Sequence, residues 1–240
     1  MQYVNNSPKN ITFLALSVPN NKENGATFVS YNPNVTEDII KTNTGKKLKE
    51  KGVCYIRKLP DIEHFKNKKI DQRIVYNFWQ TSMNTDDKYK AEQIAISQGL
   101  KVEWEDSPIF GRYMITKFYI DAFEYDKDIE KNQLFSSIAD DWVWFDTWKG
   151  LSDIQPKSRP LALEYGDNTE LTYEDKKILG KVYDNHGNKI TWNQPGDILI
   201  ICNKRFAHGR PPYILEPGES RTLGVILGDR FQRVGQKYNF

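Results

Sequence analysis

The residues best suited to chemistry lie near the C-terminal end of the chain, where a histidine follows an apolar segment. Residues 198–202 form an uninterrupted apolar run, which is typical of a buried strand, and His208 follows shortly after in a polar turn. Gly209 comes next and lets another group approach closely. Neutral imidazole is a common metal ligand, but single histidines are also often structural. The pattern therefore leaves two roles open for His208, a metal ligand or a structural side chain.

Arg221 is the second candidate, at the head of the next predicted strand. The two-residue period of a strand places Arg221 on one face with the apolar side chains of Leu223, Val225 and Leu227. An arginine that begins an inward-facing apolar row needs an anion, because an unpaired buried guanidinium is costly. A protein carboxylate could supply that anion, and so could a small acid held by two parallel hydrogen bonds. A surface position at the mouth of the strand is the third interpretation.

Other motifs exclude several classes of enzyme. His64 lies in a charged connection and His186 beside a glycine in a turn, so we expect both at the surface. The chain has no Gly-x-Ser-x-Gly nucleophile motif, no phosphate-binding Gly-x-x-x-x-Gly-Lys motif and no dinucleotide-binding Gly-x-Gly-x-x-Gly motif. Cys54 and Cys202 are too few for a cysteine-rich zinc site. Both lie in apolar runs, where reduced thiols are expected.

The composition is that of a folded protein with a sizeable core. Hydrophobic residues make up 38% of the 240 residues, and the 34 basic and 32 acidic residues nearly balance. This balance argues against a general nucleic-acid binder. No apolar run reaches the roughly 18 residues that a membrane span requires. We therefore expect a cytoplasmic protein that acts on a small molecule and binds neither nucleic acid nor a membrane.

The hydrophobic pattern predicts many strands and a few helices. Helices are expected from Thr36 to about Lys49, from Asp86 or Asp87 to Gly99, and from Thr172 to about Tyr183. A turn is expected at residues 185–188. The predicted strands are residues 11–18, 27–31, 53–56, 100–104, 113–120, 197–202 and 221–227. This order favours a β-sandwich or barrel with added helices over a parallel βαβ sheet.

The segment from Pro195 to Arg221 resembles the C-terminal signature of the Fe(II)- and 2-oxoglutarate-dependent oxygenases, in the taurine dioxygenase-like (TauD/TfdA) branch. Other segments fit the same branch in order, namely residues 52–57, 79–81, 91–92, 102–104, 143–146 and 163–167. The resemblance implies a mostly-β fold with helices, the double-stranded β-helix or jelly roll of the clavaminate synthase-like type. It implies one oxygenase domain over residues 1–240, corresponding to the C-terminal portion of the family domain.

The resemblance also implies Fe(II) and the co-substrate 2-oxoglutarate, and it suggests a role for four residues. His208 would be the distal histidine of a two-His-one-carboxylate metal site. Arg221, thirteen residues later, would bind the distal carboxylate of 2-oxoglutarate. Thr27 matches the family's Gly-Gly-x-Thr motif, with Asn24 in place of the first glycine, and would add a hydroxyl. Arg210 would face the substrate or the mouth of the 2-oxoglutarate site, with a structural salt bridge as the alternative.

One family motif is missing from the sequence. The first two metal ligands of the family come as His-x-Asp or His-x-Glu, and neither occurs in these 240 residues. Met1-Gln2-Tyr3, followed by residues 11–14, resembles the sequence just after that motif. We therefore expect an N-terminally incomplete form of a dioxygenase that hydroxylates a small polar molecule. The alternatives are a catalytically inactive jelly-roll binding module, or half of a split oxygenase whose partner chain, or homo-oligomer, completes the site.

Overall fold

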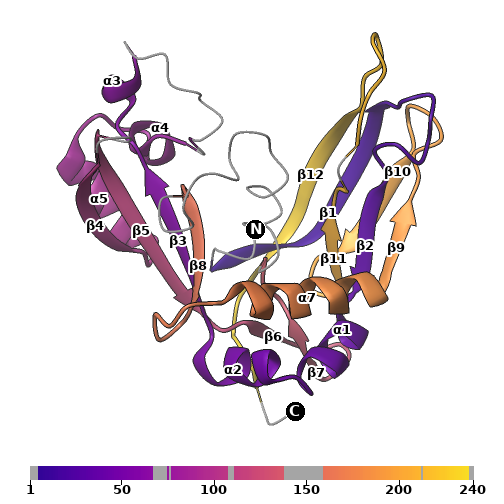
Figure 1. Cartoon of the computed structure of the whole chain (residues 1–240), viewed down its shortest axis with the longest axis horizontal. Coiled ribbons are helices and arrows are strands. Elements are labelled where there is room, and N and C mark those ends of the chain that lie inside the picture. Colours follow the sequence, from indigo (N-terminus) through magenta and orange to yellow (C-terminus); the bar gives the residue numbers. More distant parts are fainter. Residues whose placement is uncertain are drawn as a thin grey trace. The chain divides into compact units, whose positions relative to one another are not determined.

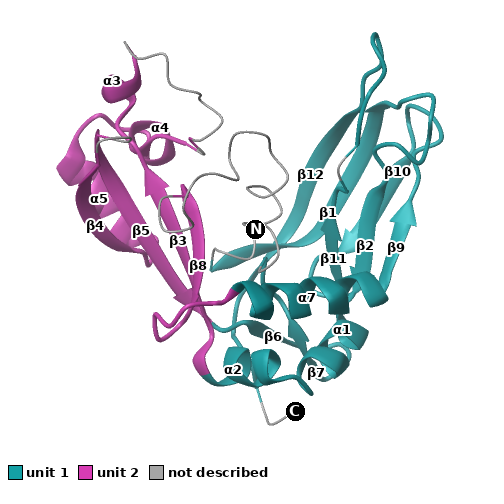
Figure 2. Ribbon diagram, viewed as in Figure 1, with its two compact units in different colours: residues 1–50, 121–137, 173–240 teal, residues 51–120, 138–172 magenta. Residues whose placement is uncertain are grey.

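The computed structural model describes residues 5–66, 75, 77–107, 111–137, 159–211 and 213–237 (Figure 1). The chain divides into two compact units (Figure 2). Unit 1 consists of residues 1–50, 121–137 and 173–240, and unit 2 of residues 51–120 and 138–172. The expectation of a single domain over residues 1–240 stays a prediction. Each unit is described by itself below.

Unit 1 contains two three-stranded antiparallel sheets. The first sheet has the order β10-β1-β12, with β1 (Asn6–Ser17) between β10 (Ile198–Cys202) and β12 (Thr222–Gln232). The second has the order β11-β2-β9, built from β11 (Phe206–Gly209), β2 (Thr27–Tyr31) and β9 (Gly187–Ile190). Strands from the two ends of the sequence therefore lie side by side (Figure 1).

An apolar core joins the inner faces of the two sheets. Alternate residues of β1 point into it, and they are Ile11, Phe13 and Ala15. Trp192 and Phe206 approach from the side of the second sheet. Two antiparallel sheets that share one core form the jelly-roll arrangement, so the predicted mostly-β class is confirmed.

Helices and one hairpin complete unit 1. The helices are α1 (Asn32–Ile39), α2 (Asn43–Lys51) and α7 (Tyr173–Asn185), and β6 (Phe123–Asp126) pairs with β7 (Lys131–Leu134). Thr36 connects α1 to this hairpin. Its hydroxyl donates to the Asn32 carbonyl (2.6 Å) and accepts from the Leu134 amide (2.8 Å).

Unit 2 is a four-stranded antiparallel sheet with short helices. The sheet order is β4-β5-β3-β8, from β4 (Lys101–Ser107), β5 (Gly111–Ile120), β3 (Val53–Leu59) and β8 (Leu161–Tyr165). The helices are α3 (Ile62–Phe65), α4 (Trp79–Met83) and α5 (Lys88–Ser97). Asp87 caps α5, since its carboxylate accepts from the amides of Tyr89 (2.9 Å) and Lys90 (3.2 Å).

Several predicted boundaries are wrong, and the structure gives the reasons. The helix expected from Thr36 to Lys49 is two helices, and it begins earlier because Pro33 occupies the first turn. The Thr42 hydroxyl accepts from the Gly45 amide (3.0 Å) and starts α2. A Cβ at Gly45 would lie 2.0 Å from the Ile39 carbonyl oxygen, so only glycine fits this break. The turn expected at residues 185–188 is shorter than predicted, because only His186 lies between the end of α7 and the start of β9.

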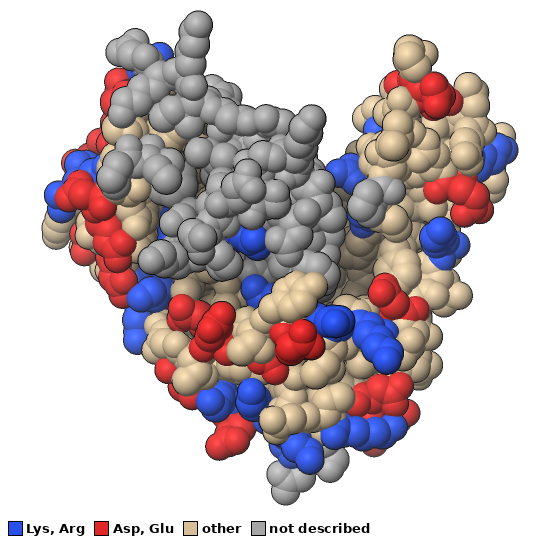
Figure 3. All heavy atoms as spheres, in the orientation of Figure 1, with Lys and Arg blue, Asp and Glu red and all other residues tan. Residues whose placement is uncertain are grey.

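Charged side chains of both signs are mixed on the face shown in Figure 3. Within the described residues, no helix is both long and apolar enough to cross a membrane. The expectations about nucleic acid, membranes and the cytoplasm stay predictions.

Candidate functional site

The second sheet places His208 on the inner side of unit 1. His208 was expected in a turn, but it lies on the short strand β11 and is paired with Val29 of β2. Directly paired residues share a face of the sheet, and so do residues two apart, so Thr27, Val29 and His208 point to the same side. The His208 ring packs edge-on against Phe13 of the first sheet, with 5.2 Å between ring centroids. The histidine therefore borders the core.

Burial keeps the His208 imidazole neutral. Loss of water around the ring lowers the pKa of His208 to about 4. Its Nδ1 is buried and has no hydrogen-bond partner among the described residues. A neutral imidazole is the form that binds metals, and a buried nitrogen without a partner is costly unless something binds it. These properties suit a metal ligand.

The Arg221 side chain is held in place by a hydrogen bond to a backbone carbonyl. Arg221 is half-buried just before β12, and its Nε donates to the Gly25 carbonyl oxygen at 2.6 Å. Gly25 has φ +91°, and a Cβ there would lie 2.7 Å from Arg221 Cδ. Only glycine therefore leaves room for the arginine. No carboxylate within the described part of the chain forms an ion pair with Arg221.

Thr27 lies at the same edge as Arg221. It follows Gly25 by two residues, is 3% exposed, and accepts a hydrogen bond from Trp192 Nε1 at 3.1 Å. This contact uses an acceptor site of the hydroxyl and leaves its proton for another partner. Arg221 contacts Gly25, and Thr27 follows two residues after Gly25 on the same segment. We call these three residues the Arg221 cradle.

Arg210 is exposed and lies near the same cradle. Its guanidinium carbon is 5.3 Å from the centroid of the Tyr213 ring, and that of Arg221 is 5.7 Å from the same centroid. Burial, and then the charge of Arg210, lower the pKa of Arg221. No salt bridge of Arg210 is seen among the described residues. The sequence analysis did not predict that Tyr213 lies near this site. The only signal in the sequence was its position between Arg210 and Arg221.

The inward row predicted on β12 is only partly buried. Leu223 packs on the core, but Val225 is 55% exposed and Leu227 is 42% exposed. Both face the same side as the buried residues of β1 to which they are paired. The row therefore has the predicted direction but not the predicted burial.

The other two histidines lie outside this site. His186 was expected at the surface, but it is half-buried and its Nε2 lies 2.8 Å from Asp38 Oδ2. His64 is in α3 of unit 2 and packs against Phe65. Two further predictions, at Met1–Tyr3 and at residues 143–146, lie outside the described residues.

The Arg221 cradle fits 2-oxoglutarate better than the described residues fit iron. A half-buried guanidinium and a hydroxyl at one edge match one carboxylate of a dicarboxylic acid. The described residues contain no group of three or more His, Cys, Asp or Glu side chains placed to hold a metal ion. His208 alone therefore does not make an iron site.

Two antiparallel sheets with a buried histidine and a half-buried arginine resemble the jelly-roll dioxygenases that use Fe(II) and 2-oxoglutarate. A clavaminate synthase-like protein of Arabidopsis thaliana is 25% identical over 168 residues, which is 70% of this chain and 46% of that protein. The chain therefore spans about half the length of the curated relative that it matches. This match agrees with the resemblance predicted from the motifs.

Solved structures of the same type are also similar to the chain. A taurine dioxygenase from Burkholderia xenovorans has a TM-score of 0.48 at 10% identity, and the match covers 97% of this chain and 58% of that one. The structure of AAD-2 in complex with Mn(II) and N-oxalylglycine has a TM-score of 0.49 at 9% identity, with 98% and 68% covered. No family model matches the sequence.

Proposed function

We propose that this chain is part of a dioxygenase that uses Fe(II) and 2-oxoglutarate to hydroxylate a small polar molecule. In this reaction 2-oxoglutarate loses CO₂ and becomes succinate while the substrate gains a hydroxyl group. Arg221 and Thr27 bind the distal carboxylate of 2-oxoglutarate, and Arg210 lies near the mouth of that site. His208 supplies one metal ligand. The compartment is the cytoplasm, and the chain binds neither nucleic acid nor a membrane.

The observation that carries the proposal is that Arg221, half-buried, has no carboxylate partner among the described residues. Its Nε is held by the Gly25 carbonyl at 2.6 Å, which fixes the side chain and directs the remaining N–H groups elsewhere. A half-buried cation without a carboxylate among the described residues is costly, and a bound dicarboxylate would offset that cost. The two-pronged guanidinium matches both oxygens of one carboxylate.

Iron requires more ligands than His208, and the described residues hold no group of three that could bind a metal ion. Affinity in such sites comes from several prearranged ligands acting together, and a single imidazole cannot hold Fe(II) at cellular concentrations. The sequence contains no His-x-Asp or His-x-Glu. In the proposed active form, two further ligands come from a longer form of the polypeptide or from a partner chain.

A binding module without catalysis is the second candidate function. The Arg221 cradle can be complete without a metal, because its groups come from β2, β12 and the residues next to them. Such a module would bind the dicarboxylate and release it unchanged. Iron binding distinguishes the two candidates.

Dicarboxylate binding tests both candidates together. We expect 2-oxoglutarate to raise the melting temperature of the chain, and Arg221→Gln to abolish that rise. The matched control is Arg112→Gln, which removes an exposed arginine whose partner is Asp106 in unit 2. An equal rise in wild type and Arg221→Gln would contradict the cradle.

Metal binding then separates the candidates. We expect no visible charge-transfer band when Fe(II) and 2-oxoglutarate are added to the 240-residue chain without oxygen, and no effect of His208→Ala on its iron binding. Adding a segment with His-x-Asp or His-x-Glu should produce the band if the oxygenase proposal holds. A clear band from the isolated chain would contradict the need for outside ligands.

A further inference from the structure

The first sheet of unit 1 is apolar on both faces. Its inner face packs on the core through β10, β1 and Leu223 of β12, while Val225 and Leu227 of that face stay exposed. The outer face is formed by the alternate residues of β10, β1 and β12 that point away from the core. Strand pairing arranges these residues in three rows, Gly228–Asn10–Cys202, Ile226–Thr12–Ile200 and Gly224–Leu14–Ile198. None of the residues in these three rows is charged, and the next residue of this face on β12, beyond the rows, is the exposed Arg230. A sheet that leaves one face in water normally carries polar and charged side chains there, so this pattern indicates a covered face.

The apolar side chains of this outer face are largely exposed in the chain. Ile198 is 62% exposed, Ile200 67% and Ile226 60%. Leu16 is 54% exposed, and its Cδ1 lies on the same side, 3.8 Å from the position of a Cβ at Gly224. Together these four side chains expose roughly 400 Å² of apolar surface, a size at which a patch usually marks an interaction site.

The outer face has both protruding residues and hollows. Ile198 and Ile200 protrude from β10, while Gly224 and Gly228 leave hollows on β12. A Cβ at either glycine would come no closer than 3.8 Å to any atom of the chain. The chain itself therefore does not require glycine at these positions, and the hollows are open to a neighbour.

We infer that this outer face binds the same face of a second copy of the chain. A two-fold axis parallel to β1 would stack the two sheets about 10 Å apart, with β10 of each copy over β12 of the other. Ile198 of one copy would then lie over the Gly224 hollow of the other, and Ile200 would lie against Ile226.

The expected area agrees with a dimer of moderate strength. With the neighbouring Thr12, Leu14, Asn10 and glycines, two copies would bury about 1,000 Å², which is the lower end of specific interfaces. The absence of charges in the three rows means that no like charges meet when the face packs on itself. This inference does not depend on the proposed oxygenase function.

Oligomeric state tests the inference. We expect the wild-type chain to sediment as a dimer when the protein concentration is raised to about 100 μM. Ile200→Lys should raise the dissociation constant of the dimer by at least about 100-fold. Gly224→Val should weaken it as well by filling the hollow. Because these side chains are exposed in the single chain, both variants should keep the wild-type melting temperature at concentrations where the wild type is dissociated. Ile96→Lys, at a 49% exposed isoleucine on α5 of unit 2, is the matched control.

Cross-linking tests the arrangement of the two copies. In a Cys202→Ser background, Thr12→Cys lies on the proposed axis, so a bismaleimide that spans about 10 Å should join two copies. Asn21→Cys, in the exposed loop between β1 and β2, should not be joined. A monomeric wild type, a dimer that survives Ile200→Lys, or equal cross-linking at both positions would overturn the inference. A monomer whose outer face binds a different polypeptide would overturn it too.

Discussion

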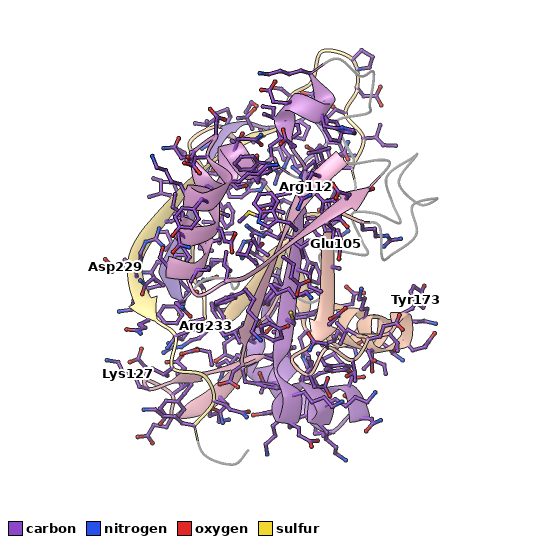
Figure 4. The ribbon with its side chains drawn as sticks, turned by 90° about the vertical axis from the view of Figure 1, so that its left-hand side faces the viewer. Glu105, Arg112, Lys127, Tyr173, Asp229 and Arg233 are labelled. Atoms are coloured by element: carbon purple, nitrogen blue, oxygen red, sulfur yellow. The ribbon has the colours of Figure 1, made fainter. Side chains whose placement is uncertain are left out.

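Two arginines at opposite ends of β12 have opposite surroundings. Arg233, labelled in Figure 4, follows the strand. Its buried guanidinium is paired, because it donates to Glu124 Oε2 (3.2 Å) and to the Asp121 carbonyl (2.7 Å). The same carboxylate accepts from the amides of Val234 (2.9 Å) and Gly235 (3.1 Å). Arg221 precedes the strand and has a carbonyl but no described carboxylate. The first arginine stabilises the fold, whereas we propose that the second binds a ligand.

The largest expected effect on stability comes from breaking the ion pair between Glu124 and Arg233. Glu124→Gln should lower the free energy of unfolding by about 3–5 kcal/mol, because it leaves the Arg233 charge buried without its counter-ion. Arg221→Gln should change stability by less than about 1 kcal/mol, since it removes no ion pair among the described residues. Urea unfolding of both variants measures the difference. Equal losses of free energy of unfolding in the two variants would show that Arg233 and Arg221 contribute equally to stability.

Gly25→Ala should lower stability by less than Glu124→Gln does, and it should also impair ligand binding at Arg221. The new Cβ would lie 2.7 Å from Arg221 Cδ, and alanine is strained at φ +91°. We expect a loss of about 1–2 kcal/mol in stability, together with loss of the melting shift caused by 2-oxoglutarate. Gly196→Ala is a control with φ +97° but nothing within 4 Å of the new Cβ. It should lose stability but keep dicarboxylate binding.

The smallest expected effect concerns a third arginine of unit 1. Arg205 Nε donates to Asp126 Oδ2 at 2.6 Å. Burial raises the pKa of Asp126, but hydrogen bonds from Arg205 and the Asp128 amide outweigh burial and leave the pKa below 3.8. As the pH falls, the Asp126 carboxylate is therefore protonated in the unfolded state before it is protonated in the folded state. The contribution of Asp126 to the free energy of unfolding is present above about pH 4 and is lost as the pH falls below it.

Asp126→Asn should accordingly cost about 1 kcal/mol near neutral pH and less at pH 3. Urea unfolding at several pH values between 3 and 7 measures this change. A loss that is the same at every pH would show that the carboxylate charge of Asp126 does not contribute.

The sequence predicted the parts of the fold that depend on local patterns. Alternation and apolar runs located β1, β2, β5 and β10, and the mostly-β class followed from them. The hairpin of β6 and β7 was missed, because its buried residues include Glu124 and Gln133, which do not look like core residues in a sequence. The burial of Glu124 depends on Arg233, more than a hundred residues away.

The candidate site shows the same division. The motif around residues 195–221 identified His208 and Arg221, and the Gly-x-Thr match identified Thr27. The hydrogen bond from Arg221 to the Gly25 carbonyl could not be predicted, because a backbone acceptor leaves no pattern of side chains in the sequence. The exposure of Val225 and Leu227 was also not predictable, because it depends on which strands lie opposite β12 and not on β12 itself.

The position of β1 has a consequence for how unit 1 folds. β1 pairs with β12 along most of its length, from Asn6 with Gln232 to Ser17 with Thr222. Contacts between such distant parts of a chain close slowly, because a long loop must be ordered before they form. During synthesis β1 leaves the ribosome about 200 residues before β12, because β1 ends at Ser17 and β12 begins at Thr222. Until then its apolar residues are exposed, so we expect that this protein depends on chaperones while it is being made.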